Sequence, residues 1–289
     1  MTSLRSDFQY FNPFTTKYEP ENALALAKAS ELAYAYQNGN RIEQTVWEWG
    51  LTDYFKMWDV DGTQSYIAAN KDIILAVFAG TNELKDWLSN LGMRPMAGPV
   101  GSVHRGFNEA LERVWDEMRN TILACKQMQV RERRRPQTLW VAGHSLGGAL
   151  ATLAVAKLRM EEDRAVNGLY TYGSPRVGDR IFARNFNLEF KAAYRIVNNN
   201  DVVTRVPGRL MMYSHVGQFL YIDTEKRLHD DIHWWHQFVD TFEGKIEAIM
   251  EKGLDYISDH SMTEYIEGLT QNRGYNPFQL QKQYAAQYA

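Results

Sequence analysis

The 289-residue sequence contains one cysteine, Cys125, so no disulfide can form within the chain. Packing alone must hold the fold, and a hydrophobic content of 45% supplies enough apolar surface for a sizeable core. A single cysteine fits a reducing compartment without requiring one. The length is typical of one large domain, so we expect a single domain over residues 1–289.

The sequence also lacks an excess of charge and a long apolar run. The net charge is −3, so no basic surplus is available to neutralise a phosphate backbone, and we do not expect nucleic acid as a partner. No stretch approaches the roughly 18 apolar residues of a transmembrane segment. Residues Met1 to Phe14 lack a signal-peptide pattern, which predicts a cytoplasmic protein or the mature form of a secreted one.

Hydrophobic periodicity predicts an α/β fold. Segments with helical spacing alternate with short apolar strands, which favours a mostly parallel central sheet with helices on both faces and antiparallel strands at its N-terminal edge. The predicted strands are 43–49, 64–69, 73–78, 138–142, 169–172, 194–197 and 216–222. The predicted helices are 20–40, 107–126, 148–160, 179–190, 236–252 and 262–269.

One short motif indicates a specific chemistry. Gly143-His144-Ser145-Leu146-Gly147 matches G-x-S-x-G, which occurs by chance in about one chain in ten of this size. Its setting makes the match more specific, because an apolar strand runs into the motif and a helix of small residues, 148–154, runs out of it. Strand, sharp turn and helix together place Ser145 at a helix N-terminus with its side chain pointing outward.

Three further stretches accompany this motif. In chain order the four are Val103-His104-Arg105-Gly106-Phe107, Gly143 to Ala149, Tyr172 to Gly178, and Asn198 to Val203. Together they resemble the class 3, or filamentous-fungal type, triacylglycerol lipases, and the likeness extends over about residues 60 to 270. The resemblance implies an α/β-hydrolase fold and hydrolysis of carboxylic esters without a cofactor.

A serine hydroxyl becomes a nucleophile when a histidine accepts its proton and a carboxylate orients that histidine. In α/β-hydrolases the acid follows the serine along the chain. Asp201 follows the apolar strand 194–197 in a loop position where such sites collect, although a turn-capping aspartate would look the same. The resemblance selects Asp201, and Asp223 and Asp179 stay as alternatives.

The histidine should follow the last predicted strand. His229, His233, His236 and His260 do so, and His215 lies just before that strand. The resemblance points to His260, in a late Asp-His loop, and implies that His215 supports the site structurally. We therefore expect His260 to be the base.

Positions 229, 233 and 236 also have spacings of four and three residues. Such spacing places the three histidines on one helical face, where they would suit a metal ion. No further Cys/His framework accompanies them, so a surface helix beside Trp234 and Trp235 is the favoured interpretation. We expect neither a metal nor another cofactor.

Acyl transfer also needs hydrogen-bond donors for the charge that develops on the substrate carbonyl oxygen. The backbone N–H of Leu146, directly after the serine, is one expected donor of this oxyanion hole. The loop after strand 73–78 offers the second, because Gly80 permits a turn and Thr81 has both an N–H and a hydroxyl. Ala79 stands where the resembled family usually has arginine, so we expect this loop to be tethered differently.

A lid is expected at about residues 82–92. Leu84, Trp87, Leu88 and Leu91 recur at i, i+3, i+4 and i+7, so a helix here has one apolar face and one charged face. An ordinary surface helix would show the same pattern, but this segment follows the oxyanion loop and matches the family's lid position. We expect it to cover the acyl groove in water and to make transient contact with a lipid–water interface.

These residues predict a serine hydrolase, a triacylglycerol lipase or carboxylesterase that acts on a lipid or small ester through an acyl-enzyme. Ser145 attacks, His260 transfers protons, Asp201 orients His260, and Leu146 and Thr81 bind the oxyanion. The same set would serve a phospholipase A1 or an aromatic-ester esterase. A catalytically silent lipase-like domain that binds a ligand or a protein is the alternative from another class, and the intact set argues against it.

Replacing Trp87 by alanine tests the lid. We expect Trp87→Ala to lower hydrolysis of emulsified long-chain esters severalfold, because the apolar face would contact the lipid surface less well. Hydrolysis of a soluble short-chain ester, which needs no interface, should stay near the parent rate. Unchanged activity on both substrates would rule out the lid.

Overall fold

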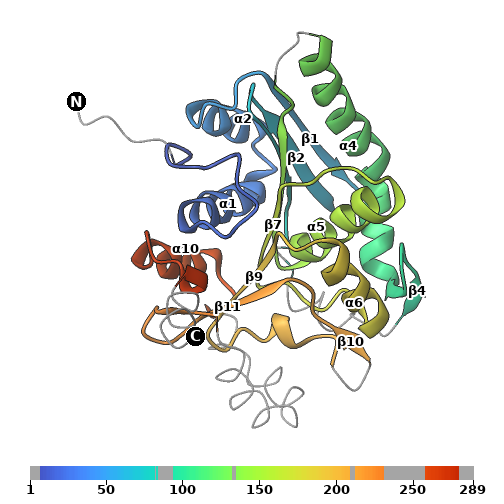
Figure 1. Ribbon diagram of the computed structural model, residues 1–289, viewed down its shortest axis with the longest axis vertical. Helices are drawn as coiled ribbons and strands as arrows, with labels where there is room; N and C mark the ends of the chain where they lie inside the picture. Colours follow the sequence, from blue (N-terminus) through green and yellow to red (C-terminus); the bar gives the residue numbers. More distant parts are fainter. Residues whose placement is uncertain are drawn as a thin grey trace, which may run out of the picture.

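The computed structural model describes residues 7–81, 83, 94–131, 135–208, 212–230 and 258–279. Its centre is an eight-stranded sheet (Figure 1). In spatial order the strands are β1 (Tyr54–Val60), β2 (Thr63–Ala69), β3 (Ile73–Phe78), β6 (Thr138–His144), β7 (Gly168–Tyr172), β9 (Ala193–Asn198), β11 (Gln218–Ile222) and β12 (Leu228–His229). Neighbours are parallel from β3 to β11 and antiparallel at both edges, which confirms the predicted, mostly parallel sheet with antiparallel N-terminal strands.

A second, smaller sheet lies beside the first in the described part of the chain. In spatial order it contains β10 (Tyr213–Ser214), β8 (Gly178–Asp179), β5 (Ser102–His104) and β4 (Pro95–Ala97), all antiparallel. The helix α6 (Arg180–Glu189) begins directly after β8. The small sheet therefore joins the start of α6 to the segment that leads into α4 (Arg105–Arg131).

The central strands form because their residues are apolar almost without interruption. All six residues of β3 and all seven of β6 are buried, as expected for parallel strands covered on both faces. Successive side chains point to opposite faces. Ile74 and Phe78 therefore join one apolar cluster, whereas Leu75 and Val77 join the other.

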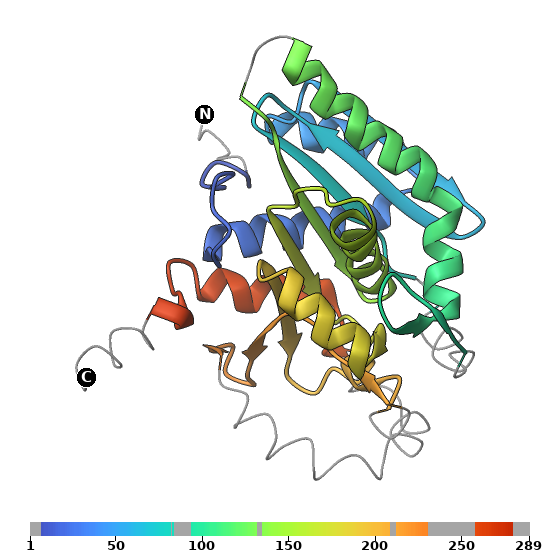
Figure 2. The same ribbon diagram turned by 45° about the vertical axis from the view of Figure 1, so that its right-hand side comes forward.

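Helices cover both faces of this sheet, as Figures 1 and 2 show. On one face pack α1 (Pro20–Leu32) and α10 (Met262–Gln271), and on the other α4, α5 (Leu146–Ala156) and α6. A 3-10 turn, η1 (Ala33–Ala35), extends α1, and a π-helical turn, η2 (Lys157–Glu161), extends α5. No helix within the described ranges combines the length and apolar character needed to cross a membrane.

One predicted strand is wrong. Residues 43–49 lie almost entirely in the helix α2 (Gly39–Glu48). The Asn38 side chain accepts a hydrogen bond from a backbone N–H of the first turn at 3.2 Å and so caps this helix. Ile42 and Val46, four residues apart, are its buried residues, so the apolar spacing is helical.

Other boundaries also differ from the sequence pattern. The first predicted helix stops at η1, before α2 begins, instead of continuing to residue 40. The pattern does not predict β1, because only Trp58 is buried in this edge strand and the apolar alternation is lost. The predicted helix 236–252 lies outside the described residues, and so do the lid residues Leu84, Trp87, Leu88 and Leu91.

Removing the Asn38 cap should weaken α2. We expect Asn38→Ala to lower the free energy of unfolding by about 1 kcal/mol, because a first-turn N–H loses its acceptor. Asn40→Ala, at an exposed position within the same helix, is the matched control and should be neutral or slightly stabilising. Urea unfolding of both variants gives the comparison, and equal effects would show that the cap contributes nothing.

Candidate active site

Ser145 forms a tight turn between β6 and α5. The strand ends at His144 and the helix begins at Leu146, so one residue connects them. Its φ of 57° and ψ of −128° lie in a region that residues with a side chain rarely adopt, and such conformations persist where the surroundings fix them. The Ser145 N–H donates to the Tyr172 carbonyl at the end of β7, at 2.9 Å. The serine is therefore held at the carboxyl edge of the sheet, at a helix N-terminus.

The glycines two residues before and after the serine allow this turn. A Cβ on Gly143 would lie 2.2 Å from the carbonyl oxygen of Gly147. A Cβ on Gly147 would lie 2.1 Å from the carbonyl oxygen of Phe78 in β3. Because both clashes are with backbone atoms, the turn requires glycine at both positions.

Asp201 and His260 form a buried pair at the same edge. His260 Nδ1 lies 2.8 Å from Asp201 Oδ2, and both side chains are buried. Asp201 follows β9, the neighbour of β7, whereas His260 comes from the loop that leads into α10. The carboxylate accepts the Nδ1 proton, which leaves Nε2 of the neutral imidazole able to accept another.

Two further donors hold the carboxylate of Asp201. The Tyr265 hydroxyl donates to Oδ2 at 2.6 Å, and the Val203 N–H donates to Oδ1 at 2.9 Å. Burial, together with the adjacent Asp201 charge, raises the pKa of Tyr265 well above its usual value, so this hydroxyl stays protonated. Sequence reasoning missed Tyr265, although the aromatic segment after His260 was a usable signal.

Two side-chain atoms at this site have no hydrogen-bond partner within the described residues. They are Ser145 Oγ and His260 Nε2, and both are buried. The ring of His260 packs against that of His144, directly before Ser145, with centroids 4.4 Å apart. Leaving a buried polar atom unpaired costs about 1–3 kcal/mol, so each atom is a candidate to bind a reacting group.

The two segments expected to donate to the oxyanion lie next to the serine. Leu146 is the first residue of α5, so its N–H has no acceptor within the helix. The loop of Gly80 and Thr81 follows β3, the neighbour of β6, and a Cβ on Gly80 would lie 3.0 Å from Ser145 Cβ. The Glu83 N–H donates to Thr81 Oγ1 at 3.1 Å, which ties the hydroxyl to its own loop.

Known proteins are similar to this chain in sequence and in structure. A family model described as Lipase (class 3) matches residues 75–211, a span that includes Ser145 and Asp201. Over this span, just under half of the sequence, the chain resembles the class 3 lipases. The resemblance seen in the four sequence stretches is confirmed, and so is the α/β-hydrolase fold.

Individual members of the class 3 lipase family match parts of the chain. The secreted mono- and diacylglycerol lipase 1 of Fusarium solani is 35% identical over 168 residues, 56% of this chain and 48% of its own. The Rhizomucor miehei triacylglyceride lipase structure superposes with a TM-score of 0.60 at 25% identity, over 71% of this chain and 80% of its own. A structure whose description reports a serine protease triad as the catalytic centre of a triacylglycerol lipase gives 0.58 at 27%, over 70% and 79%. The chain spans about half the length of the curated relatives that it matches.

The alternative acids have structural partners instead. Asp223 accepts hydrogen bonds from Arg227 Nε at 3.0 Å and His229 Nε2 at 2.8 Å in the turn between β11 and β12. Asp179 caps α6 through the Phe182 N–H. Asp201 is thus the predicted acid that the structure pairs with His260.

Of the three remaining candidate histidines, the structure describes His215. The backbone carbonyl of Thr204 lies 2.7 Å from His215 Nε2 and accepts its proton, which anchors the loop after Asp201. His233 and His236 lie outside the described residues. Among the residues that the structure does describe, no three His, Cys, Asp or Glu side chains converge as a metal site would require.

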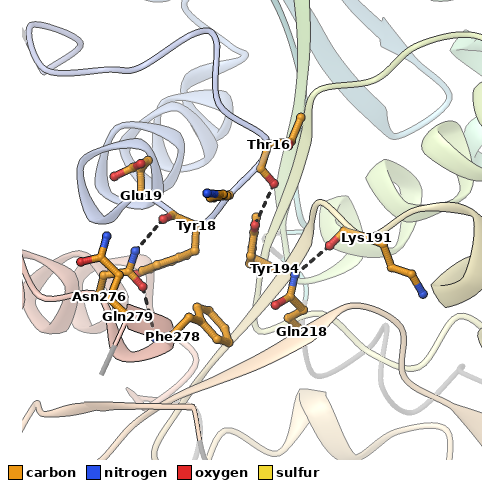
Figure 3. Close-up of a pocket in the computed structure, with 10 residues that line it drawn as sticks. Thr16, Tyr18, Glu19, Lys191, Tyr194, Gln218, Asn276, Phe278 and Gln279 are labelled. Atoms are coloured by element: carbon orange, nitrogen blue, oxygen red, sulfur yellow. Dashed lines mark hydrogen bonds between the residues drawn. The ribbon is translucent and has the colours of Figure 1, made fainter. Parts of the chain in front are cut away.

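A cavity of about 710 Å³ has another set of lining residues, which Figure 3 draws as sticks. Its walls include Tyr18 of the N-terminal segment, Tyr194 and Gln218 at the amino ends of β9 and β11, and Phe278 near the end of the described chain. Ser145 and Asp201 follow the carboxyl ends of β6 and β9. The cavity is therefore at the opposite edge of the sheet from the candidate active site.

The Asp223 carboxylate makes stability depend on pH. Burial favours its neutral form, but hydrogen bonds from His229, Arg227 and the Glu225 N–H outweigh burial and lower its pKa to about 2. In the unfolded chain the value is about 3.9, so the charged form stabilises the fold above that pH, and this contribution is lost as the pH falls from about 4 towards 2.

Asp223→Asn should reproduce that loss. We expect the variant to be about 1–2 kcal/mol less stable than the parent at pH 7, with the difference narrowing as the pH falls below about 4. Asp163→Asn, whose side chain is 98% exposed, is the control and should change little at any pH. Urea unfolding across this range gives the comparison, and a difference independent of pH would contradict the assignment.

Proposed function

We propose that the protein is a serine hydrolase that cleaves carboxylic esters of lipids through an acyl-enzyme intermediate, with Ser145 as nucleophile. One observation carries the proposal. His260 Nδ1 is hydrogen-bonded to Asp201, while His260 Nε2 and Ser145 Oγ are both buried and without a partner in the described part of the chain. A base with its second nitrogen available, beside a strained serine at a helix N-terminus, is the arrangement that acyl transfer needs.

The reaction follows from these positions. As Ser145 Oγ attacks the ester carbonyl carbon, His260 Nε2 takes the hydroxyl proton and a tetrahedral oxyanion forms. The N–H groups of Leu146 and Thr81 are our proposed oxyanion donors. Collapse of the intermediate breaks the bond to the alkoxide, which leaves as an alcohol with the proton from His260. Water, activated by His260 in the same way, then releases the acid and restores Ser145.

Asp201 stabilises the charged step. When His260 is protonated, the carboxylate 2.8 Å from Nδ1 offsets the positive charge in a setting shielded from water. The hydrogen bonds from Tyr265 and Val203 compensate the burial of the carboxylate and set its direction. Tyr265 is a positioning residue in this proposal, since it contacts Asp201 and not the ester.

We infer the substrate class from the names of the relatives. Their names include mono- and diacylglycerol lipases, triacylglycerol lipases and, at 31% identity, an Arabidopsis thaliana phospholipase A(1). We therefore propose an acylglycerol ester and keep phospholipid as the second candidate. The lid and its contact with a lipid–water interface stay part of the proposal. The Fusarium relative is named as secreted, which supports the mature secreted form over the cytoplasmic one.

The decisive experiment is hydrolysis of para-nitrophenyl esters from short to long acyl chains. We expect Ser145→Ala and His260→Ala each to lower kcat by about 10⁴-fold or more, because such residues act as one unit. Asp201→Asn should cost about 10⁴-fold, since the histidine loses its orienting charge. His229→Ala disrupts the second Asp–His pair of the described chain and is the matched control, with kcat near the parent value.

Each outcome separates two interpretations. A parent protein that hydrolyses no ester and resists labelling by a fluorophosphonate probe would instead be a catalytically silent binding domain. Activity that survives in His260→Ala but not in Ser145→Ala would mean that another group is the base. Parallel assays with triacylglycerol and phospholipid emulsions then decide between the two candidate substrates.

A further inference from the structure

The residue before the serine makes two hydrogen bonds that the reaction scheme does not use. His144 Nδ1 lies 2.6 Å from the Tyr34 hydroxyl, and His144 Nε2 lies 2.8 Å from the backbone carbonyl oxygen of His260. Tyr34 belongs to η1, which is 110 residues earlier in the chain. His144 therefore connects the N-terminal region to the loop that carries the proposed base.

The direction of each hydrogen bond follows from its acceptor. A carbonyl oxygen only accepts hydrogen bonds, so His144 Nε2 carries a proton and donates a hydrogen bond to the backbone carbonyl of His260. His144 is buried, and burial together with the adjacent His260 lowers its pKa well below the usual value, which keeps the ring neutral. Its Nδ1 then has a free lone pair, which accepts the Tyr34 hydroxyl proton.

Tyr34 also reaches the oxyanion loop. Its hydroxyl oxygen packs so closely against Gly80 that a Cβ there would lie 2.0 Å from it. Burial raises the pKa of Tyr34, so the hydroxyl remains protonated and donates onward. One directed series of hydrogen bonds thus runs from Tyr34, which lies against Gly80, through His144 to the carbonyl of His260.

We propose that Tyr34 and His144 are positioning residues that fix the oxyanion loop and the His260 loop in their places around Ser145. The inference rests on the proposed function, because it assigns the roles of the three loops from that reaction. The oxyanion loop and the serine turn follow strands of the sheet, and the His260 loop precedes α10. The two hydrogen bonds connect Tyr34 and the serine turn to the His260 loop, and the contact between Tyr34 and Gly80 adds the oxyanion loop.

Tyr34→Phe removes one oxygen atom and leaves the ring in place. We expect kcat on a soluble short-chain ester to fall about 10- to 100-fold, because a misplacement of about 1 Å between reacting groups has an effect of this size. KM should stay within about twofold of the parent, since ground-state binding is unaffected. Tyr66→Phe is the matched control: it removes another buried hydroxyl, which donates to the Ala29 carbonyl of α1 at 3.0 Å. Its kcat should equal that of the parent even if both variants lose similar thermal stability.

Two substitutions of His144 test whether this side chain donates a hydrogen bond to the His260 carbonyl. Glutamine offers an amide donor to the His260 carbonyl, whereas leucine offers none, so His144→Gln should retain about tenfold more kcat than His144→Leu. Nitrogen-15 NMR of the parent imidazole should show the neutral form protonated at Nε2. This spectrum reports on the hydrogen bonds whether or not any ester is hydrolysed.

The outcomes distinguish this inference from the proposed function. A parent that is active on esters, with Tyr34→Phe within about twofold of its kcat, would overturn the positioning role and leave the function intact. Equal losses of kcat in Tyr34→Phe and Tyr66→Phe would also overturn it, by showing a general effect of lost stability. A proton on Nδ1 of His144 would contradict the direction of the series, and a parent inert on all esters would remove both proposals.

Discussion

The single-residue turn at Ser145 constrains the structure around it. Because one residue joins β6 to α5, the start of the helix passes so close to the end of β6 and to β3 that only glycine fits at positions 143 and 147, respectively. The same proximity brings the Gly80 loop against the serine. The positive φ of Ser145 persists because the Tyr172 carbonyl and the flanking strand and helix fix the backbone. The reactive group therefore stands on rigid elements, which keep its geometry accurate.

The parallel order of the sheet brings the other groups to this turn. Carboxyl ends of neighbouring parallel strands meet at one edge, so the segments after β3, β6 and β9 converge although they are far apart in sequence. Asp201 is completely buried there, and an isolated charge would be costly in such a place. Three donors, from His260, Tyr265 and Val203, remove that cost and leave the carboxylate one orientation.

Sequence patterns predict these features unevenly. The buried central strands are predictable because a short continuous apolar run such as 73–78 is typical of a parallel strand that is covered on both faces. Ser145 is predictable because its turn demands glycines at fixed spacing. The helix α2 is not, since its cap and its two buried residues give a weak signal in a short segment. Tyr34 is not predictable either, because a hydroxyl that acts across 110 residues leaves no local pattern.

The two Asp–His pairs of the described chain show that such a pair does not define an active site by itself. Both have a nitrogen–oxygen distance of 2.8 Å. His229 uses Nε2 towards Asp223, is 32% exposed, and shares that carboxylate with Arg227, whose charge already offsets it. His260 uses Nδ1, so its Nε2 is the nitrogen left for a proton from outside the pair, and burial keeps water from competing for it. The difference in chemistry therefore arises from which nitrogen the carboxylate engages and from the desolvation around the other.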